Sequence, residues 1–368
     1  MSDRIHILNV LLSLEPGGLE NGVVNIVNNL NDQRFKTTIC CLQVKGEFAS
    51  RITAKDVDIT EWGMKPGNDY GLIWRLSRYI KQLNPDIIHT RNQKAYFHGY
   101  AAGRLAGHRK FVHSEHGRTF PGKKRKMRLQ GFLSRHTDAV VSVSAQLRRD
   151  LEMYAYIPEG KIQVIYNGVD DQRFQSSDRV GTRQQLGFGG SDVVVGIVGR
   201  MEPVKNYKLL VEALATLPKG ANVHLLAIGD GSERASLEQQ ARRLGLANQV
   251  HFTGYRQDVE KFYAAMDIFV LPSFSEGLSN TLLEAMVSGV AAIGSDVGGN
   301  REIITHNETG YLFPSDDQAQ LQACLEKCLG KLERQRLALN GKQDIHKRFS
   351  IERMVSQYEE LYTRVYRG

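Results

Sequence analysis

Short apolar runs alternate with longer segments of helical periodicity through most of the chain, and this alternation constrains the fold more than any other feature. The segments from Leu72 to Leu83 and from Ala145 to Tyr154 place apolar residues at helical spacing. Such alternation predicts βαβ units and a parallel sheet. The expected strands of the first half are Ile5 to Leu12, Thr37 to Leu42, Asp86 to His89, Phe111 to His113, Ala139 to Val143 and Ile162 to Ile165.

The alternation stops between Asp170 and Asp192, where the chain is polar and irregular, and then starts again. The expected strands of the second half are Val193 to Val198, Val223 to Ile228, Val250 to Phe252, Ile268 to Leu271, Val290 to Ile293 and Tyr311 to Phe313. We therefore expect an α/β protein with two doubly wound domains joined by a linker. Their expected bounds are 1–175 and 190–348, and a last helix over 349–368 is expected to pack back toward the first domain.

Composition excludes disordered and membrane-spanning classes. Apolar residues make up 41% of the 368 positions and charged residues 24%, as in folded globular proteins. No apolar run approaches the roughly 18 residues of a membrane helix, and no secretory signal opens the chain, so a cytoplasmic protein is expected. The four cysteines, Cys40, Cys41, Cys324 and Cys328, lack the spacing of a zinc site and are expected to be packing residues.

The net charge of +8 suggests an anionic partner, which could be a nucleic acid, a membrane or a phosphorylated substrate. Nine cations against one acid, Glu115, lie between Gly107 and His136 and are expected to form a patch on one face. They are Arg109, Lys110, Arg118, Lys123, Lys124, Arg125, Lys126, Arg128 and Arg135. A nucleic-acid-binding protein would add an aromatic-lined stripe or a helix-turn-helix pattern, and the sequence contains neither.

Three loops that follow expected strands carry candidate chemistry, because ligands of open parallel sheets bind beyond the carboxyl ends of the strands. Gly17 and Gly18 follow the first strand and could bring backbone amides close to an anion, although a plain tight turn explains them equally well. Arg200 and Lys205 follow the strand that opens the second half and could converge on one diphosphate. Ordinary solvated surface charge is the alternative for both cations.

The strongest local signal lies between Ser275 and Met286. Apolar Leu282, Leu283, Ala285 and Met286 predict a helix that begins near Ser279 to Thr281. Glu276 then lies in the loop before this helix and Glu284 inside it, so both carboxylates could face one cleft. Carboxylates suit hydrogen bonds to sugar hydroxyls, and free amides at a helix start suit a phosphate. An exposed helix residue and a partner of the helix dipole are the alternative reading.

In combination, these motifs resemble the retaining glycosyltransferases of family four, which have the GT-B fold. The resemblance covers nearly the whole chain. It is carried by the following motifs: E-x7-E at Glu276 and Glu284, G-R-x-x-x-x-K from Gly199 to Lys205, the Gly17-Gly18 turn, Asn167-Gly168-Val169-Asp170 and Gly229-Asp230-Gly231. His89-Thr90-Arg91-Asn92 and Glu115-His116-Gly117-Arg118 look most like bacterial exopolysaccharide sugar transferases.

The resemblance implies two Rossmann-like domains facing across a cleft, with the nucleotide sugar held mainly by the second. By analogy Arg200 and Lys205 neutralise the diphosphate in place of a metal, Glu284 binds the ribose and Glu276 binds the transferred sugar. No metal and no resident cofactor are expected, and a UDP-sugar is the expected co-substrate. The implied donor-binding residues are Gly17, Gly18, Gly199, Arg200, Lys205, Tyr255, Arg256, Glu276, Gly277, Leu278, Ser279, Asn280, Thr281 and Glu284.

His116 matches a histidine that lines the family's catalytic cleft, so the implied catalytic residues are His116, Arg200, Lys205 and Glu276. Gly117 stands where the family often has aspartate, and any role of that aspartate does not carry over. The implied reaction is a metal-independent, retaining hexosyl transfer to a saccharide or lipid-linked saccharide. A basic segment over 109–135 could contact an anionic membrane at its inner face, or be a solvated loop and helix. A nucleotide-sugar epimerase or a phosphorylase remains an alternative.

Overall fold

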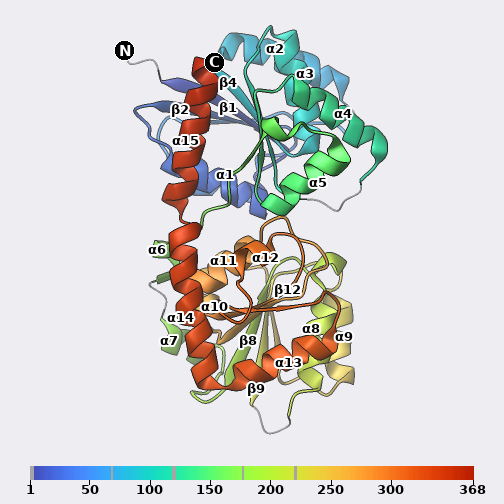
Figure 1. Ribbon diagram of the computed structural model, residues 1–368, viewed down its shortest axis with the longest axis vertical. Coiled ribbons are helices and arrows are strands. Elements are labelled where there is room, and N and C mark those ends of the chain that lie inside the picture. Colours follow the sequence, from blue (N-terminus) through green and yellow to red (C-terminus); the bar gives the residue numbers. More distant parts are fainter. Residues whose placement is uncertain (1–3, 68, 118–121, 176–177, 219–221) are drawn as a thin grey trace. The chain divides into compact units, whose positions relative to one another are not determined.

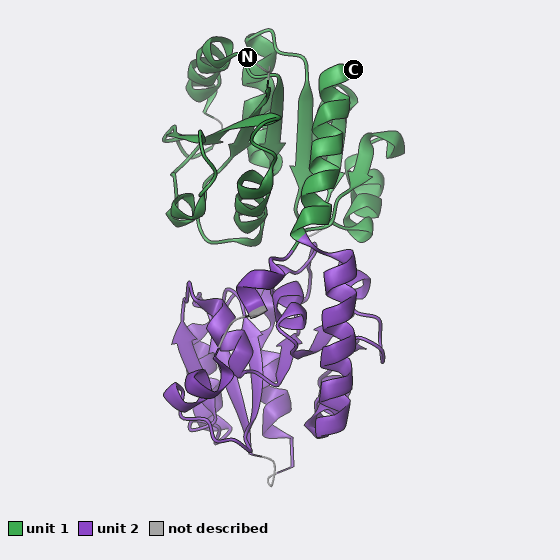
Figure 2. Ribbon diagram, turned by 90° about the vertical axis from the view of Figure 1, so that its left-hand side faces the viewer, with its two compact units in different colours: residues 1–168, 351–368 green, residues 169–350 purple. Residues whose placement is uncertain are grey.

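The structure is a computed structural model that describes residues 4–67, 69–117, 122–175, 178–218 and 222–368. It divides the chain into two compact units (Figure 2). Unit 1 contains residues 1–168 and 351–368, and unit 2 contains residues 169–350. The chain therefore enters unit 2 at Val169 and returns to unit 1 at Ile351.

Unit 1 is built on a parallel sheet of seven strands within its described part, in the order β3-β2-β1-β4-β5-β6-β7. The strands are β1 (Ile5–Leu11), β2 (Phe35–Cys41), β3 (Asp58–Glu61), β4 (Ile87–Arg91), β5 (Phe111–Glu115), β6 (Ala139–Ser142) and β7 (Ile162–Val164). The first strand lies in the middle of the sheet, between β2 and β4. This order is typical of doubly wound folds, in which the chain proceeds outward first on one side and then on the other.

Helices cover both faces of this sheet (Figure 1). Apolar residues of α1 (Gly18–Asn29) and of the last helix α15 (Ile351–Arg367) pack against one face, and α2 (Tyr70–Leu83) and α3 (Gln93–Leu105) pack against the other. The helices α4 (Lys124–Arg135) and α5 (Ala145–Ala155) follow β5 and β6, and two short helical turns are η1 (Glu47–Arg51) and η2 (Glu159–Lys161). The helix α15 thus completes the core of unit 1 although it lies at the end of the sequence.

Unit 2 repeats the architecture with six parallel strands in its described part, in the order β10-β9-β8-β11-β12-β13. The strands are β8 (Val193–Val198), β9 (Val223–Ile228), β10 (Val250–Gly254), β11 (Ile268–Leu271), β12 (Ala291–Ser295) and β13 (Tyr311–Phe313). The helices are α6 (Asp171–Gln175), α7 (Arg179–Gln185), α8 (Tyr207–Ala215), α9 (Arg234–Arg243), α10 (Val259–Ala265), α11 (Asn280–Val287), α12 (Asn300–Ile303), α13 (Gln318–Leu329) and α14 (Lys331–Arg348), with the turn η3 (Pro203–Lys205). The two predicted doubly wound folds are confirmed.

The polar interval from Asp170 to Asp192 is not the irregular linker that its composition suggests. It carries the helices α6 and α7, and it belongs to unit 2. Arg173 donates to Glu260 at 2.8 Å, and the buried Arg183 donates to Asp267 at 3.1 Å. These ion pairs fix the polar helices to the unit. Ser176 and Ser177 of this interval lie outside the described residues.

Candidate functional site

The candidate donor residues of unit 2 follow neighbouring strands at the carboxyl edge of its sheet. Gly199, Arg200 and Lys205 lie in the loop after β8, and Glu276 lies in the loop after β11. These strands are adjacent, since Ile268 and Phe269 of β11 pair with β8. Parallel strands end at the same edge, so the topology gathers the loops there.

The loop after β8 is fixed by close backbone contacts. The Gly199 carbonyl accepts a hydrogen bond from the hydroxyl of buried Tyr207 at 2.7 Å. A Cβ atom on Gly229 would lie 1.9 Å from the Gly199 carbonyl oxygen, so only glycine fits at that position. Gly199 itself has a φ of +153°, which side-chain-bearing residues rarely adopt. The loop therefore starts from a defined geometry and leads into η3, which carries Lys205.

Lys205 and Glu276 form an ion pair. The Lys205 Nζ lies 2.6 Å from the Glu276 Oε1, and the two side chains are 22% and 9% exposed. The Ser273 hydroxyl donates to the same oxygen at 2.6 Å. A backbone hydrogen bond of 2.8 Å from Phe274 to Val204 ties the two loops together. The sequence predicts Lys205 for a phosphate and Glu276 for a sugar, and the structure brings the two side chains together.

The loop that carries Glu276 rests on a pair of glycines that follow β12. A Cβ atom on Gly298 would lie 1.9 Å from the Glu276 carbonyl oxygen, and one on Gly299 would lie 2.2 Å from that of Gly277. Ser295, at the end of β12, donates to the Ser273 carbonyl at 2.6 Å. The backbone of the loop that carries Glu276 is therefore positioned by residues at and after the end of β12 as well as by β11.

The helix α11 begins where the sequence predicts. Ser279 is its N-cap and accepts a hydrogen bond from the Leu282 amide at 3.3 Å. The Thr281 hydroxyl lies 3.1 Å from that of Ser279. Leu278 is buried and anchors the turn. Residues Gly277 to Thr281 thus form the approach to a helix N-terminus, where backbone amides and the helix dipole favour an anion.

Glu284 is oriented by a buried tyrosine. The Tyr263 hydroxyl donates to the Glu284 Oε2 at 3.0 Å and also to the Thr281 carbonyl at 3.3 Å. Burial first, and then the nearby Glu284 carboxylate, raise the pKa of Tyr263 well above its ordinary value, so the hydroxyl stays a donor. One oxygen of Glu284 is held in this way while the residue remains partly exposed.

The remaining donor candidates of unit 2 differ in how they are held. Arg200 is exposed and has no ion pair among the residues that the structure describes. Arg256 is paired through two hydrogen bonds of 3.0 Å with Asp258, and its guanidinium lies 4.9 Å from the centre of the Phe262 ring. The Tyr255 side chain is 46% exposed. Arg200 is therefore available to an anionic ligand, whereas Asp258 already neutralises the charge of Arg256.

In unit 1 the candidates lie at the carboxyl edge of its own sheet. Gly17 is the N-cap of α1 in an extended conformation, and Gly18 is the first residue of that helix. His116 directly follows β5, and its ring lies 4.0 Å from the position of a Cβ on Gly22 of α1. Both ring nitrogens of His116 are buried without a hydrogen-bond partner in the described part of the chain. Burial, and then the Arg91 guanidinium, lower the pKa of His116 to about 3, so the ring is neutral.

Several residues that position the site were missed by sequence reasoning. Tyr263 and Ser273 act through contacts between distant elements, and no local pattern marks them. The doublet Gly298-Gly299 could have been found, because it follows a strand just as Gly17-Gly18 does.

The basic segment is divided by the structure. Arg109 and Lys110 precede β5 at the amino edge of the unit 1 sheet, whereas α4 starts beyond the carboxyl end of that strand. The expected single patch over 109–135 is therefore wrong for these described residues, because one strand length separates its two parts. Arg118 lies outside the described residues.

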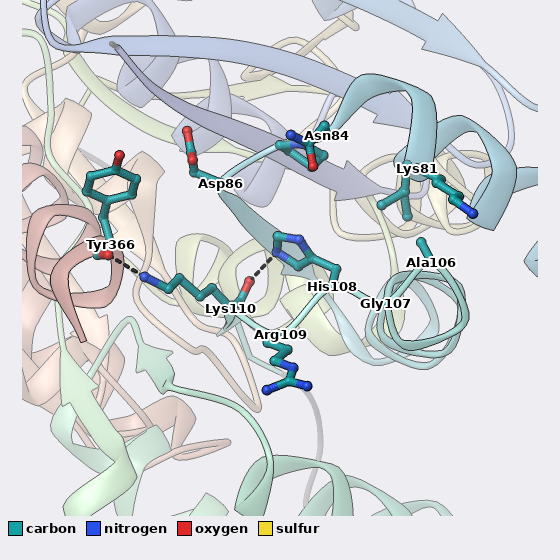
Figure 3. A pocket seen from close by; sticks show the side chains of 11 residues that line it. Lys81, Asn84, Asp86, Ala106, Gly107, His108, Arg109, Lys110 and Tyr366 are labelled. Carbon is teal, nitrogen blue, oxygen red and sulfur yellow. Dashed lines mark hydrogen bonds between the residues drawn. The ribbon is translucent and has the colours of Figure 1, made fainter.

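A pocket of about 330 Å³ lies at that amino edge, opposite the candidate site of unit 1 (Figure 3). Figure 3 shows the charged ends of Lys81 and Arg109 pointing in different directions. The Lys110 ammonium donates to the carbonyl of Tyr366 at the end of α15, and Asp86 accepts from the backbone amide of His6 at 2.8 Å. These groups therefore cap helix and strand ends rather than converge on a ligand.

Within the described residues, no group of three or more His, Cys, Asp or Glu side chains is arranged to hold a metal ion. The four cysteines are buried free thiols. No described helix combines the length and the apolar character that crossing a bilayer requires.

Both halves of the sequence match known families. Residues 16–173 match the family described as Glycosyltransferase Family 4, and residues 178–344 match Glycosyl transferases group 1. The N-acetyl-alpha-D-glucosaminyl L-malate synthase of Bacillus anthracis is 29% identical over 82% of this chain and 81% of its own length. The UDP-Gal:alpha-D-GlcNAc-diphosphoundecaprenol alpha-1,3-galactosyltransferase of Escherichia coli is 27% identical over 78% of this chain and 77% of its own.

The fold also matches solved structures. The crystal structure of Anabaena Alr3699/HepE in complex with UDP and glucose superposes with a TM-score of 0.88 at 25% identity, over 98% of this chain and 100% of the other. The same Anabaena protein has been solved with UDP-glucose. The similarity therefore extends over both units and is not limited to one of them.

Proposed function

The chain belongs to the family 4 glycosyltransferases, group 1, which use nucleotide-sugar donors on a GT-B fold, and from this premise we propose its reaction. It transfers a hexosyl group from a UDP-sugar to a saccharide or lipid-linked saccharide, with retention of the anomeric configuration and without a metal. The observation that carries this proposal is the grouping of Arg200, Lys205, Glu276 and the start of α11 at one sheet edge.

In this reaction the cations of unit 2 bind the donor diphosphate. Arg200 is exposed, and Lys205 has three N–H donors, of which Glu276 uses one. Lys205 can therefore bind a phosphate oxygen while it stays paired with Glu276. The amides at the start of α11 add partial positive charge. As the anomeric bond breaks, negative charge grows on the leaving phosphate, and these preorganised groups stabilise it more than they stabilise the ground state.

The carboxylates of unit 2 orient the donor. Glu284 is held by Tyr263 at the second turn of α11, where it suits the ribose hydroxyls. Glu276 has its Oε1 occupied by Lys205 and Ser273, which leaves Oε2 for a hydroxyl of the transferred sugar. A carboxylate tied to a lysine in this way is a poor nucleophile. Same-face substitution, with the leaving phosphate assisting deprotonation of the acceptor, is therefore favoured over double displacement.

His116 is the residue of unit 1 that we assign to the sugar. Its ring nitrogens lack protein partners in the described chain, and its lowered pKa keeps one of them an acceptor at neutral pH. A neutral imidazole can accept a hydrogen bond from a sugar hydroxyl without adding positive charge near the oxocarbenium-like centre. A hydrogen-bond acceptor at this position must be neutral, and the surroundings of His116 keep its ring neutral.

The choice of UDP rests on relatives. The Anabaena protein binds UDP and UDP-glucose, and the Escherichia coli relative is named for UDP-Gal. A thermal-shift panel with UDP, GDP and ADP tests the donor site, and we expect UDP to stabilise the protein. Lys205→Ala and Glu284→Ala should each weaken this stabilisation, corresponding to about tenfold in Kd for a lost charge-assisted contact.

Lys208→Ala is the matched control, because Lys208 is 69% exposed on α8 and pairs only loosely with Glu212 at 3.8 Å. It should keep the wild-type response to UDP. Unchanged UDP binding in both site variants would overturn the donor site. Anomeric coupling constants of the product, measured by NMR, distinguish retention from inversion. Product formation in the presence of a chelator distinguishes metal-independent from metal-dependent transfer. Turnover of the nucleotide sugar without an acceptor would instead indicate an epimerase, and a requirement for inorganic phosphate would indicate a phosphorylase.

We further propose that α4 contacts an anionic membrane that carries a lipid-linked acceptor. The name of the Escherichia coli relative gives that enzyme an acceptor linked to diphosphoundecaprenol. Leu129 and Phe132 are 40% and 57% exposed, and exposed cations surround them on the helix. These cations are Lys124, Arg125, Lys126, Arg128 and Arg135. Exposed apolar side chains among cations suit the interface of an anionic bilayer. Residues 118–121 of the basic segment expected over 109–135 lie outside the described residues.

Sedimentation with vesicles tests this contact. The wild type should bind vesicles that contain phosphatidylglycerol and leave pure phosphatidylcholine vesicles unbound. The double variant Leu129→Ser, Phe132→Ser should lose about tenfold or more in affinity, because two apolar side chains no longer leave water. Leu339→Ser serves as the control, since Leu339 is 59% exposed on α14 of unit 2. Equal binding of the double variant and the wild type would refute the membrane role of α4.

A further inference from the structure

One face of the unit 1 sheet changes from apolar to polar along its strands. On the face covered by α15, the first residues are apolar, as in Ile7, Ile87 and Val112. Two residues further along each strand the same face carries polar residues, since side chains alternate with a period of two. We call Asn9, His89, Arg91, Ser114 and His116 the polar row. Asn9 pairs with His89 in register, and Arg91 pairs with Ser114.

Arg91 lies at the centre of the polar row. Its Nε and Nη2 donate to the Asn9 Oδ1 at 3.3 and 3.1 Å, and its Nη2 lies 3.3 Å from the His89 Nδ1. A guanidinium only donates hydrogen bonds, so the His89 Nδ1 is an acceptor. The His89 proton is therefore on Nε2, which lies 2.6 Å from the Ser114 hydroxyl oxygen and donates to it.

The last helix closes the polar row from outside the sheet. The Tyr362 hydroxyl lies 2.7 Å from the His89 Nδ1 and donates to it, since that nitrogen is an acceptor. The Tyr358 ring centre lies 5.5 Å from the Arg91 guanidinium carbon, within the range of a cation–π contact. Arg91 is thus enclosed between strands and α15, with a relative exposure of 0%.

Burial of the Arg91 cation is unfavourable in free energy, and no described carboxylate neutralises its charge. Among the described residues no carboxylate forms an ion pair with Arg91, and its Nη1 has no hydrogen-bond partner. Buried charges are normally paired, because transfer of an unpaired charge out of water costs more than neutral contacts return. A neutral side chain would serve packing better. The positive charge of Arg91 therefore calls for a functional explanation.

His116 offers such an explanation, because it directly follows β5 and is the next residue of the polar row after Ser114. The charged and titratable groups that act on its ring come from both adjacent strands: Arg91 and His89 on β4, and His113 and Glu115 on β5. Glu115 opposes Arg91 but is occupied by Gln130, which donates to it at 2.9 Å, and it lies 3.8 Å from the His113 Nε2. Arg91 is the permanent cation of this set.

We propose that Arg91 is a positioning residue for sugar transfer: held by Asn9, His89 and the tyrosines of α15, it adds to burial in keeping the His116 ring in its neutral, hydrogen-bond-accepting form. The role of His116 in transfer rests on the proposed function. The protonation state of the His116 ring does not depend on the proposed function, and it can be measured without a substrate. The lowered pKa of His116 agrees with the geometry.

The first test is an NMR titration of the histidine rings in the full-length protein, with His116→Gln to assign the signal. In the wild type the His116 signal should change little from pH 8 to pH 4, because the pKa of its ring is lowered to about 3. In Arg91→Met the apparent pKa should rise by about one unit or more, because a neighbouring cation no longer opposes protonation, so the His116 signal should begin to move above pH 4. Arg91→Lys retains a cation and should resemble the wild type. Arg104→Met, on the exposed side of α3, removes the same charge elsewhere in unit 1 and should change nothing.

The second readout is the pH profile of kcat/KM for sugar transfer. In Arg91→Met the value of kcat/KM should fall toward acidic pH, whereas in Arg91→Lys it should not. In Arg91→Met kcat should fall more than KM rises. A wild-type His116 that titrates near its ordinary pKa overturns the inference even if Arg91→Met does not fold. A His116 signal in Arg91→Met as constant as in the wild type also overturns it. An inactive wild type with a constant His116 signal would instead refute the proposed function.

Discussion

At the scale of residues, glycines set the position of the Glu276 carboxylate. Gly298 has a φ of +48°, and a Cβ there would overlap the Glu276 carbonyl oxygen at 1.9 Å. Gly298→Ala should therefore displace residues 276–278 and weaken UDP stabilisation by about tenfold in Kd, besides a cost of roughly 1–2 kcal/mol in stability for the left-handed conformation. The measurement is the UDP-dependent thermal shift.

Gly289→Ala is the matched control for this prediction. Gly289 has a φ of +76°, but its nearest neighbour, the Lys342 side chain, lies 4.0 Å from the Cβ position. The control therefore shares the backbone strain and lacks the steric overlap. If both variants lost UDP binding equally, the contact between Gly298 and Glu276 would not be what positions the site.

Residue types at the site could be predicted from sequence, but their partners could not. The sequence contains the spacing that marks Lys205, Glu276 and Glu284, since strand ends and helix starts are local patterns. Lys205 and Glu276 are 71 positions apart, and their pairing depends on the adjacency of β8 and β11. Arg91 belongs to the motif His89-Thr90-Arg91-Asn92, yet its contacts with Asn9 and with Tyr358 of α15 join positions 82 and 267 residues apart.

At the scale of elements, the polar helix α7 shows how unit 2 is held together. Asp267 accepts from Arg179 at 2.8 Å and from Arg183 at 3.1 Å. Arg183 is buried and also donates to the carbonyls of Ala265, Gly189 and Asp192. Arg183→Ala should lower the free energy of unfolding by about 3 kcal/mol, because three backbone carbonyls lose their donor and Asp267 loses one of its two arginine partners.

Arg179→Ala is the comparison, since the Arg179 side chain is 45% exposed and its contacts are open to water. Its cost should be below about 1 kcal/mol. Urea denaturation of both variants measures the difference. Equal and small losses would show that residues 170–192 behave as the linker that composition predicts.

The elements that sequence predicted best are those buried on both faces. Strands such as β8 and β11 are almost entirely apolar, and a continuous apolar run is visible without any neighbour. The edge strand β3 was missed because it reads Asp-Ile-Thr-Glu, with both charged ends exposed. The helices α6 and α7 were missed for a related reason: each is short, and apart from buried Phe174 of α6 they are held by ion pairs to α10 and Asp267.

At the scale of the whole molecule, the two units carry different kinds of titratable groups. Histidines whose pKa is lowered mainly by burial are His6, His89, His108 and His116 in unit 1 and His251 in unit 2. Carboxyl groups whose pKa is lowered by hydrogen bonds are Asp230, Asp258 and Glu333 in unit 2 and Asp69 in unit 1. The units should therefore respond to acid over different pH ranges.

The sign follows from the direction of each shift. A histidine with a lowered pKa is neutral in the folded state, so below about pH 6.5 the unfolded state binds more protons and the free energy of unfolding falls. His89 and His116 should each cost about 2 kcal/mol between pH 6.5 and pH 5. The lowered carboxyl groups keep their contribution until the pH falls below about 4. Unit 1 should thus weaken first.

Trp62 and Trp74 are the only tryptophans of the sequence, and both belong to unit 1, so their fluorescence reports that unit alone. Between pH 7 and pH 5 the urea midpoint from fluorescence should fall further than the midpoint from circular dichroism, to which the helices of both units contribute. His116→Gln should recover about 2 kcal/mol of the loss at pH 5, because glutamine takes up no proton. If the two midpoints shifted together, or if His116→Gln were as acid-sensitive as the wild type, buried neutral histidines would not control the acid response of unit 1.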